Sequence, residues 1–248
     1  MENNDLLRRA EDLRARCEKT ASRTMSGFLT PAEQYKIQCR TKAATGCTLI
    51  FKGGNEACER KMAFFLPDYD DPEYFDESEY IKAIRLTAFF GAPGHRDYMG
   101  ALLGMGVGRE WVGDIWVKDN TAYVFCQPSV ERHLLGIDKV GRYSVKAEPI
   151  ALSDIPAPER RVTQESFSVM SMRLDAVVGG MFHLSRTEAA KQVEAGLVSL
   201  NYEECIKTDA QIHEGDIISL RGAGKGTVTG TGGTSRKGRL FVYAEMLK

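Results

Sequence analysis

The apolar positions in the first part of the chain predict two helices followed by two strands. Residues 5–22 carry the mixed apolar and charged pattern of an amphipathic helix, and residues 31–43 predict a second helix. The second helix opens with a threonine and a proline, a capping residue followed by the residue favoured at the first helical position. Short apolar runs at 47–54 and 61–67 predict strands. We therefore expect this part to combine helices with a sheet.

Alternating strand and helix signals follow an acidic segment. Strands are predicted at 80–88, 114–118, 121–126 and 143–150, and helices at 96–106 and 128–136. Asp119-Asn120 suits a tight hairpin turn between the second and third of these strands. The resulting βαββαβ order predicts a split-βαβ sandwich of the ferredoxin or RRM-like kind. Three prolines in and around the next stretch, EPIALSDIPAPERR, predict a linker over 153–164.

The segment from residue 173 to residue 201 predicts two short helices, a tight turn between them and a strand directly afterwards. The second helix opens on S-R-T-E, a capping box in which Ser185 and Glu188 satisfy free backbone donors. Its apolar residues share one face: Ala189, Ala190, Val193 and Leu197. Gly196 stands where a left-handed cap ends such a helix.

Two further strands are predicted near the C-terminus, at 215–222 and 238–246. The stretch between them is rich in Gly and Thr and predicts a flexible loop whose cations can reach phosphates. Taken together, the pattern predicts the α+β class. The expected parts are an N-terminal α+β region at 1–78, an RRM-like region at 79–152, the linker at 153–164 and a C-terminal domain at 165–248.

The composition narrows the class of protein. The chain has 248 residues, 43% apolar and 27% charged, which is ordinary for a globular protein of two domains. Its six cysteines form no C-x-x-C pair and its first residues form a charged helix, not an export signal. We therefore expect reduced thiols and a cytoplasmic location. No run of 18 apolar residues occurs, so we expect no membrane-spanning segment.

The charge is unevenly distributed along the chain. The net charge is −1, but residues 68–79 hold seven acids and no base, so the remainder carries +6. The balance is +5 over 221–248 and +3 over 1–42. Basic patches of this kind favour a polyanionic partner, with a solvated surface as the alternative interpretation. We expect the acidic segment to be a solvated linker.

A motif in the C-terminal part resembles a known RNA-binding element. R-L-D, then S-R-x-E-A about ten residues later, and finally G-x-V-x-x-N are similar to the alpha-L motif found in ribosomal protein S-four and its relatives. The similarity covers residues 165–248 and implies an alpha-L RNA-binding domain there. One position departs from the motif, because Tyr202 replaces the usual Gly after Asn201. Tyr tolerates positive φ poorly, so a hairpin at this point is expected to need another turn geometry.

The middle of the chain carries a second resemblance. GHRDYMGALLGMGVGREWVGDIWV, residues 94–117, is similar to the signature of the bacterial YlmH family, and with it the similarity extends over nearly the whole chain. The resemblance implies a ribosome-associated RNA-binding protein encoded near division genes, and we expect this protein to be non-catalytic. Smaller alpha-L relatives bind the large ribosomal subunit carrying stalled peptidyl-tRNA. The implied partners are therefore ribosomal RNA and the ribosome, with no small-molecule substrate.

Arg186 is the leading candidate for an RNA contact. It lies at a helix N-terminus, where free N–H groups and the helix dipole favour a phosphate. Alternatively its stem packs against the helix and its head reaches water. Arg173 is a second candidate, with pairing to Asp175 or Glu188 as its alternative. The further candidates for phosphate contact are Lys191, Lys207, Arg221, Lys225, Arg236 and Lys237, and Ser185 and Thr187 are candidates for hydroxyl contacts.

A secondary RNA surface is predicted in the middle region, where His95, Arg96 and Arg109 stand outside the apolar pattern. In the competing interpretation Arg96 pairs with Asp97 or Asp114 and holds a turn. The nearby cluster of glycines is not a dinucleotide fingerprint, since no G-x-G-x-x-G follows a strand. We therefore expect no nucleotide cofactor.

Enzyme motifs are largely absent. The kinase-like H-R-D at residue 95 lacks the required Asn and D-F-G, and R-G-A-G-K-G lacks the Ser or Thr of a phosphate loop. His and Cys residues lack ligand spacing, so we expect no metal. Two alternatives to RNA binding remain. One is an RNA-modifying enzyme that uses Asp175, the Asp of an R-L-D shared with pseudouridine synthases. The other is a scaffold linked to cell division that docks through the acidic segment 68–79.

Overall fold

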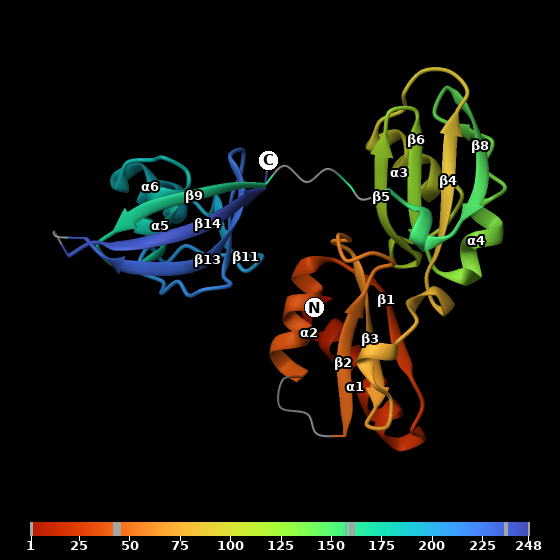
Figure 1. Cartoon of the computed structure of the whole chain (residues 1–248), viewed down its shortest axis with the longest axis horizontal. Helices are drawn as coiled ribbons and strands as arrows, with labels where there is room; N and C mark the ends of the chain where they lie inside the picture. The colour runs from red at the N-terminus through yellow and green to blue at the C-terminus, as the bar shows by residue number, and fades with distance from the viewer. Residues whose placement is uncertain (1, 42–45, 157, 159–161, 236–237, 248) are drawn as a thin grey trace. The chain divides into compact units, whose positions relative to one another are not determined.

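The computed structural model describes residues 2–41, 46–156, 158, 162–235 and 238–247. The chain forms two compact units, Met1–Pro158 and Glu159–Lys248, and each is described by itself (Figure 1). Helices and antiparallel sheets occur together in both units, so the predicted α+β class is confirmed. No helix within the described ranges is both long enough and apolar enough to cross a membrane.

The first unit begins with two helices on a three-stranded sheet. The elements are α1 (Glu2–Thr20), β1 (Thr24–Leu29), α2 (Pro31–Thr41), β2 (Cys47–Lys52) and β3 (Lys61–Pro67). The strand order is β1-β3-β2, with both pairs antiparallel (Figure 1). Ile37 of α2 and Phe65 of β3 are buried in the core between helices and sheet. The predicted helices and strands are confirmed, whereas β1 was not predicted.

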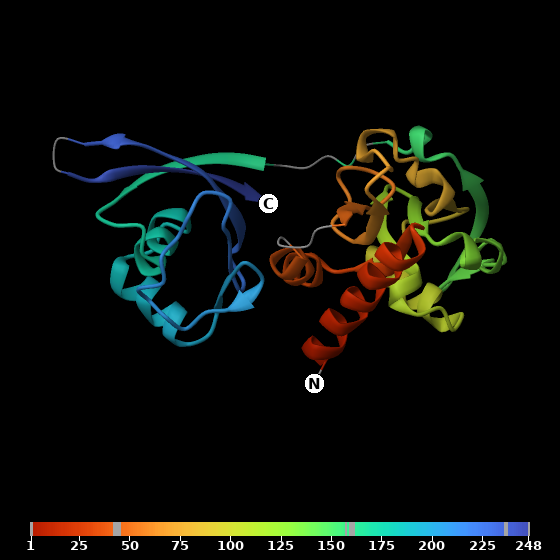
Figure 2. The ribbon, with the colours of Figure 1, turned by 90° about the horizontal axis from the view of Figure 1, so that it is seen from below.

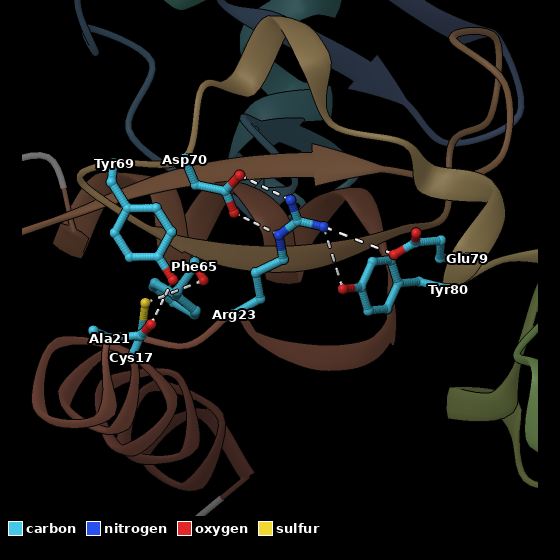
Figure 3. A network of polar contacts seen from close by, with 8 residues as sticks. All are labelled: Cys17, Ala21, Arg23, Phe65, Tyr69, Asp70, Glu79 and Tyr80. Carbon is cyan, nitrogen blue, oxygen red and sulfur yellow. Dashed lines mark hydrogen bonds and ion pairs between the residues drawn. The ribbon is translucent and has the colours of Figure 1, made fainter.

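Most of the acidic segment is exposed, as predicted, but it is not a free linker, because Phe75 packs against the first sheet. It forms two short 3-10 turns, Pro72–Tyr74 and Glu77–Glu79. Arg23 Nη2 donates a hydrogen bond of 2.8 Å to Asp70 Oδ1 (Figure 3). The same guanidinium lies 5.2 Å from the centre of the Phe75 ring. Phe75 is 8% exposed and packs on Phe64 at 4.8 Å. A neutralising arginine and a buried ring thus hold the segment in place.

Arg23 should therefore contribute measurably to stability. The hydrogen bonds from Arg23 lower the pKa of Asp70 below its ordinary value. The stabilisation is then complete above that ordinary value, about 3.9, and is lost as the pH falls through the lowered pKa. We expect Arg23→Ala to lower the free energy of unfolding by about 1–2 kcal/mol at pH 7. Urea unfolding should show that the wild type is more stable than Arg23→Ala at pH 7 and that this difference in unfolding free energy disappears in acid.

A matched control is Arg9→Ala, because Arg9 pairs with Asp5 at 2.7 Å on the open surface of α1. Exposed pairs contribute roughly 0–1 kcal/mol. Equal unfolding free energies for both variants at pH 7 would show that the acidic segment does not depend on Arg23.

The rest of the first unit is a five-stranded antiparallel sheet with two helices. Its elements are β4 (Lys82–Ala88), α3 (His95–Gly104), the 3-10 turn Arg109–Trp111, β5 (Val112–Lys118), β6 (Thr121–Cys126), α4 (Pro128–Leu134), β7 (Lys139–Val140), β8 (Tyr143–Ile150) and the 3-10 turn Leu152–Asp154. The strand order is β5-β6-β4-β8-β7. The predicted βαββαβ order is confirmed, with β7 as an addition. Asp119-Asn120 forms the predicted two-residue hairpin, since Lys118 pairs with Thr121.

The two faces of this sheet have different partners. Leu86 and Val124 face the core that contains Tyr98 and Leu102 of α3. The opposite face packs in part against the first sheet, where Phe125 is fully buried in a cluster with Phe28 and Phe64. Helices therefore cover one face, and the other face is partly covered by the N-terminal elements.

The second unit has one six-stranded antiparallel sheet and two helices. The elements are β9 (Val162–Val169), α5 (Leu174–Met181), α6 (Arg186–Glu194), β10 (Val198–Leu200), β11 (Glu203–Glu204), β12 (Ile217–Leu220), β13 (Gly224–Thr234) and β14 (Leu240–Leu247). The strand order is β11-β10-β12-β13-β14-β9. Figure 2 shows both helices, drawn in teal, on one side of the long strands. Val178 of α5 and Val193 of α6 are buried against Val242 and Ala244 of β14.

Three expectations for this unit are corrected. The stretch predicted as a flexible Gly/Thr loop is largely the strand β13, because β12 and β14 pair with it on both sides. Strand β9 begins at Val162, inside the predicted linker. Asn201 and Tyr202 form a tight hairpin turn with φ of 50° and 69°, so Tyr202 does adopt the left-handed conformation. Hydrogen bonds hold the turn, since Asn201 Nδ2 donates to Asp216 Oδ1 at 2.8 Å and the backbone N–H of Ile217 donates to Asn201 Oδ1 at 2.9 Å.

Candidate nucleic-acid interface

The start of α6 is fixed by its own sequence. The backbone N–H of Glu188 donates to Ser185 Oγ at 3.2 Å, and the backbone N–H of Ser185 donates to Glu188 Oε2 at 3.0 Å. These bonds form the predicted capping box, and the hydrogen bonds that the Glu188 carboxylate accepts from the Ser185 hydroxyl and from the Ser185 backbone N–H lower the pKa of Glu188. Gly196, with φ of 69°, follows the end of the helix as predicted. The first turn of α6 is therefore a rigid platform for the side chain of Arg186.

A buried carboxylate lies between two arginines beside this platform. Asp175, in the first turn of α5, is only 4% exposed. Arg173 donates to both of its oxygens, with Nε 3.2 Å from Oδ1 and Nη2 3.1 Å from Oδ2. Arg186 Nε lies 3.5 Å from Oδ2. The side chain of Arg186 is 61% exposed and that of Arg173 is 35% exposed, so Asp175 holds both cations while leaving them open to solvent. We name Arg173, Asp175 and Arg186 the arginine clamp.

The electrostatics of the arginine clamp favour the charged forms of Asp175 and Arg173. Burial raises the pKa of Asp175, but the hydrogen bond from Arg173 and the charges of both arginines outweigh it, so the net pKa lies below its ordinary value. The same hydrogen bond raises the pKa of Arg173. Two cations and one anion leave a local charge of +1, with guanidinium N–H groups available at the surface. Guanidinium groups held in this way match the oxygens of a phosphate.

Other candidate residues lie near the arginine clamp. Thr187 and Lys191 are exposed on α6, one turn apart. Lys207 is exposed in the segment that packs against the start of α5, where the backbone N–H of Asp175 donates to the carbonyl oxygen of Thr208 at 3.0 Å. Lys191 lies beside Glu188 and the acid Asp209 lies beside Arg173, so these cations add positive charge to a surface that also carries acids.

The structure does not bring every candidate to this place. The Ser185 hydroxyl is used internally, because it donates to Glu188 Oε2 at 2.7 Å. Arg221 follows β12, and its backbone N–H donates to the carbonyl oxygen of Leu197, beyond the other end of α6. Lys225 lies on β13, opposite Ser219. Arg236 and Lys237 lie outside the described residues.

The secondary surface predicted in the first unit is only partly assembled. His95 and Arg96 are exposed in the first turn of α3, whereas the Arg109 guanidinium contacts the sulfur of Met99. The alternative pairing of Arg96 with Asp97 or Asp114 is not formed. Asp97 accepts a hydrogen bond from the backbone of Gly94 at 2.8 Å, and Asp114 accepts hydrogen bonds from the backbone of the segment before β3.

Sequence reasoning did not identify the position of Asp175. Arg173 was expected either to contact RNA or to pair with Asp175 or Glu188, yet one buried acid organises Arg173 and Arg186 together. The sequence gives one signal of this arrangement. Asp175 is an acid in the first turn of a predicted helix, with Arg173 two residues before it and Arg186 eleven residues after it. Within the described residues, no group of three His, Cys, Asp or Glu side chains is placed to hold a metal ion.

Comparison with known proteins supports the resemblance to YlmH proteins. The family model described as "Putative RNA-binding domain in YlmH" matches residues 75–154. The chain is 31% identical to the "Ribosome-associated protein quality control protein P2" of Bacillus subtilis (strain 168) over 225 residues, which cover 90% of this chain and 87% of the relative.

A solved structure supports the fold. The "Cell division protein ylmH from Streptococcus pneumoniae" superposes with a TM-score of 0.55 and 18% identity, covering 63% of this chain and 96% of that one. At this identity the likeness concerns the fold alone. The identity to the curated relative and the extent of its coverage establish that the chain belongs to the YlmH family.

Proposed function

We propose that this protein is a non-catalytic RNA-binding factor that associates with the ribosome in the cytoplasm and contacts structured ribosomal RNA through its second unit, an alpha-L domain. The arginine clamp is the observation that carries this proposal, because a buried acid there presents two arginines to solvent. The name of the Bacillus subtilis relative, a ribosome-associated quality control protein, supports the ribosome as the partner. The large subunit with its peptidyl-tRNA is the proposed setting.

The geometry suits a folded RNA better than a particular base sequence. Arg186 lies in the first turn of α6 and Arg173 is the N-terminal cap of α5, so both stand where helix N–H groups favour an anion. Lys191 and Lys207 are further exposed cations of the same unit. Such an array of cations contacts phosphates. The bases of an A-form helix lie in a deep, narrow major groove that side chains do not reach, so the backbone is the accessible part of the RNA. We infer recognition of RNA shape through the backbone.

The surroundings of Asp175 argue against the enzyme alternative. Its side chain is 6% exposed and both of its oxygens contact arginines. A nucleophile has to reach its substrate, whereas this carboxylate is enclosed by the groups that it positions. We therefore propose a positioning role for Asp175.

The contacts of the acidic segment argue against the scaffold alternative. Several of its acids bind within the unit: Asp70 and Glu79 contact Arg23, Glu77 accepts a hydrogen bond from the backbone of Gly54, and Asp71 and Asp76 cap the 3-10 turns. These carboxylates serve the fold of the first unit. Docking of a partner would have to displace them.

Sedimentation through a sucrose gradient tests the proposed function. Four phosphate contacts, from Arg173, Arg186, Lys191 and Lys207, give a log–log slope of affinity against salt of about −3. Raising the salt fourfold should therefore weaken binding by roughly fiftyfold. We expect the chain to migrate with ribosomal particles at about 50 mM salt and to shift to the free pool at about 200 mM and above. Migration in the free pool at both salt concentrations would support a scaffold role instead.

A further inference from the structure

Two adjacent phenylalanines in the first unit lie on the open surface. They follow β4 directly, and their exposed fractions are 60% for Phe89 and 84% for Phe90. Apolar side chains of this size are usually buried, and an exposed pair marks an interaction surface. Figure 1 shows the loop that contains them passing over one end of the five-stranded sheet. We name residues 89–94 the Phe loop.

The Phe loop is anchored at its base. The backbone N–H of Ala88 donates to the carbonyl oxygen of Asn120 at 2.8 Å, and Asn120 Nδ2 donates back to the carbonyl oxygen of Ala88 at 2.9 Å. The backbone N–H of Phe89 donates to the carbonyl oxygen of Ser144 at 3.1 Å. Gly91, with φ of 72°, lies against the ring of Tyr143, where a larger residue would clash. The backbone therefore holds both rings outward.

The sheet face, which stacks bases in RRM proteins, has little aromatic surface left here. In RRM domains, aromatic side chains on the two central strands stack on bases. The central strands in this sheet are β4 and β6. On that face, Phe125 is fully buried and packs on Trp116 at 4.9 Å, while Arg85 pairs with Glu148 at 3.0 Å. Tyr123 of β6 and Trp116 of β5 also lie on this face and are partly buried, so the Phe loop offers more exposed aromatic surface than the face itself.

Cations surround the same end of the sheet. Arg96 and His95 are exposed directly after the Phe loop. The guanidinium of Arg142 lies 5.1 Å from the centre of the Tyr143 ring, and Tyr143 contacts the Phe loop through Gly91. Lys118 is exposed beside the Asp119-Asn120 turn. The acids here are Asp119 and Asp97, and Asp97 is engaged with the backbone of Gly94. Aromatic rings between cations are the arrangement that binds single-stranded nucleic acid.

We propose that the Phe loop is a second RNA-binding surface, on which Phe89 and Phe90 stack against unpaired bases while Arg96 and Arg142 contact the flanking phosphates. The inference rests on the proposed RNA-binding function and adds a surface in the other unit. The loop lies within residues 75–154, which match the RNA-binding family model. Its occupant is single-stranded RNA, such as a bulge or a loop, because the rings are flanked by cations and stacking requires a base with a free face.

A direct test uses the full chain and a photoreactive RNA. The probe is a fluorescein-labelled oligouridine of about 12 nucleotides in which one base is replaced by 5-iodouridine. Stacking of an iodinated base on an aromatic ring favours cross-linking under ultraviolet light. We expect the cross-linked peptide to contain Phe89 or Phe90. A cross-link found only in peptides of the second unit would overturn the proposal.

Binding measurements separate stacking from apolar docking. Each base–aromatic stack is lost with the ring, so we expect the double variant Phe89→Ala, Phe90→Ala to bind the probe about tenfold or more weakly in fluorescence anisotropy. The double variant Phe89→Leu, Phe90→Leu should lose a similar amount, because leucine keeps the apolar character but not the ring. Wild-type affinity of the leucine variant would indicate an apolar protein partner and contradict the proposal. Tyr74→Ala is the matched control, since Tyr74 is also 84% exposed but lies among acids; its affinity should not change.

The outcome can be distinguished from failure of the arginine clamp. The same probe is offered to the chain with Arg173→Glu and Arg186→Glu, and the cross-link to the Phe loop should persist when the probe is in excess. If that chain still binds structured ribosomal RNA normally, the proposed function fails while the Phe loop result stands. If the alanine variant of the Phe loop binds the oligouridine normally, only the second surface is refuted. Both phenylalanines are mostly exposed, so thermal unfolding of the variants should match the wild type.

Discussion

Replacing Arg186 by glutamate is expected to weaken the binding of structured ribosomal RNA to the full chain by more than about tenfold. The substitution removes a guanidinium from the first turn of α6 and places a carboxylate close to Asp175, where a phosphate would be repelled. The fold should survive, because the Arg186 side chain is 61% exposed and Arg173 still pairs with Asp175. A filter-binding assay at low salt gives the affinity, and circular dichroism monitors the fold.

A matched control for this substitution is Arg132→Glu. Arg132 is also an exposed arginine on a helix, but it lies on α4 in the other unit and outside both proposed surfaces. The control changes the net charge by the same amount, so a non-specific electrostatic effect would weaken both variants equally. Equal affinities for the Arg186→Glu variant and the wild type would show that α6 does not face the RNA.

Replacing Asp175 by asparagine should distinguish two roles of this carboxylate. If only its charge matters, RNA affinity should rise; if it positions the arginines, RNA affinity should fall. The substitution makes the chain more positive by one charge, which by itself would strengthen the binding of a polyanion. If Asp175 holds the arginines in place, its loss frees two long side chains that must be ordered again on binding. We expect RNA affinity to fall by about tenfold. A filter-binding assay with the same RNA measures the direction of the change.

The same variant should be less stable in a pH-dependent way. Removing one partner of a buried ion pair costs several kcal/mol, and the exposure of the arginines reduces this to about 1–3 kcal/mol at pH 7. The folded pKa of Asp175 is lowered, so its contribution is complete above about pH 4 and is lost as the pH falls through the folded value. Urea unfolding of wild type and Asp175→Asn should therefore converge in acid. Stronger RNA binding by this variant would instead assign Asp175 a repulsive role.

Local signals in the sequence were sufficient for the elements that they define. The capping box of Ser185 and Glu188 and the Asp119-Asn120 turn are formed as predicted, because each involves residues within three positions of one another. The apolar stripe of α6 is confirmed in part, because Ala189 and Val193 are fully buried, whereas Ala190 is half-buried and Leu197 lies beyond the end of the helix. Such features depend on neighbours in the chain and can be identified from it.

Features that depend on distant partners were missed. Strand β13 contains Gly and Thr in a pattern typical of loops. It is a strand because β14 pairs along nearly all of it and β12 pairs with its first residues, 224–227. Strand β9 pairs with β14, about 80 residues later in the chain. Tyr202 accepts a left-handed conformation because the side chain of Asn201 is bonded to Asp216 and to the backbone of Ile217. None of these partners is adjacent in sequence.

In the candidate site, too, the local features were predicted and the features that depend on distant partners were not. The motif around Arg173 and Arg186 singles out both cations, and both lie at helix starts on the surface. The central role of Asp175 could not be predicted, because burial to 4% exposure depends on packing of α5 against the segment that contains Thr208. Similarly, the sequence does not show that Phe90 is exposed, because its exposure depends on how the loop after β4 lies at the end of the sheet. Sequence identified the charged groups, whereas the structure shows how they are held.

The salt dependence of RNA binding tests the central claim most directly, since it counts phosphate contacts. The slope of the logarithm of affinity against the logarithm of salt concentration should be measured for the wild type, for Arg186→Gln and for the control Arg132→Gln with one structured ribosomal RNA fragment. If Arg186 contacts a phosphate, its loss reduces the magnitude of the slope by about 0.7–0.9, while the control keeps the wild-type slope. Identical slopes for all three proteins would contradict the claim that the arginine clamp binds the RNA backbone.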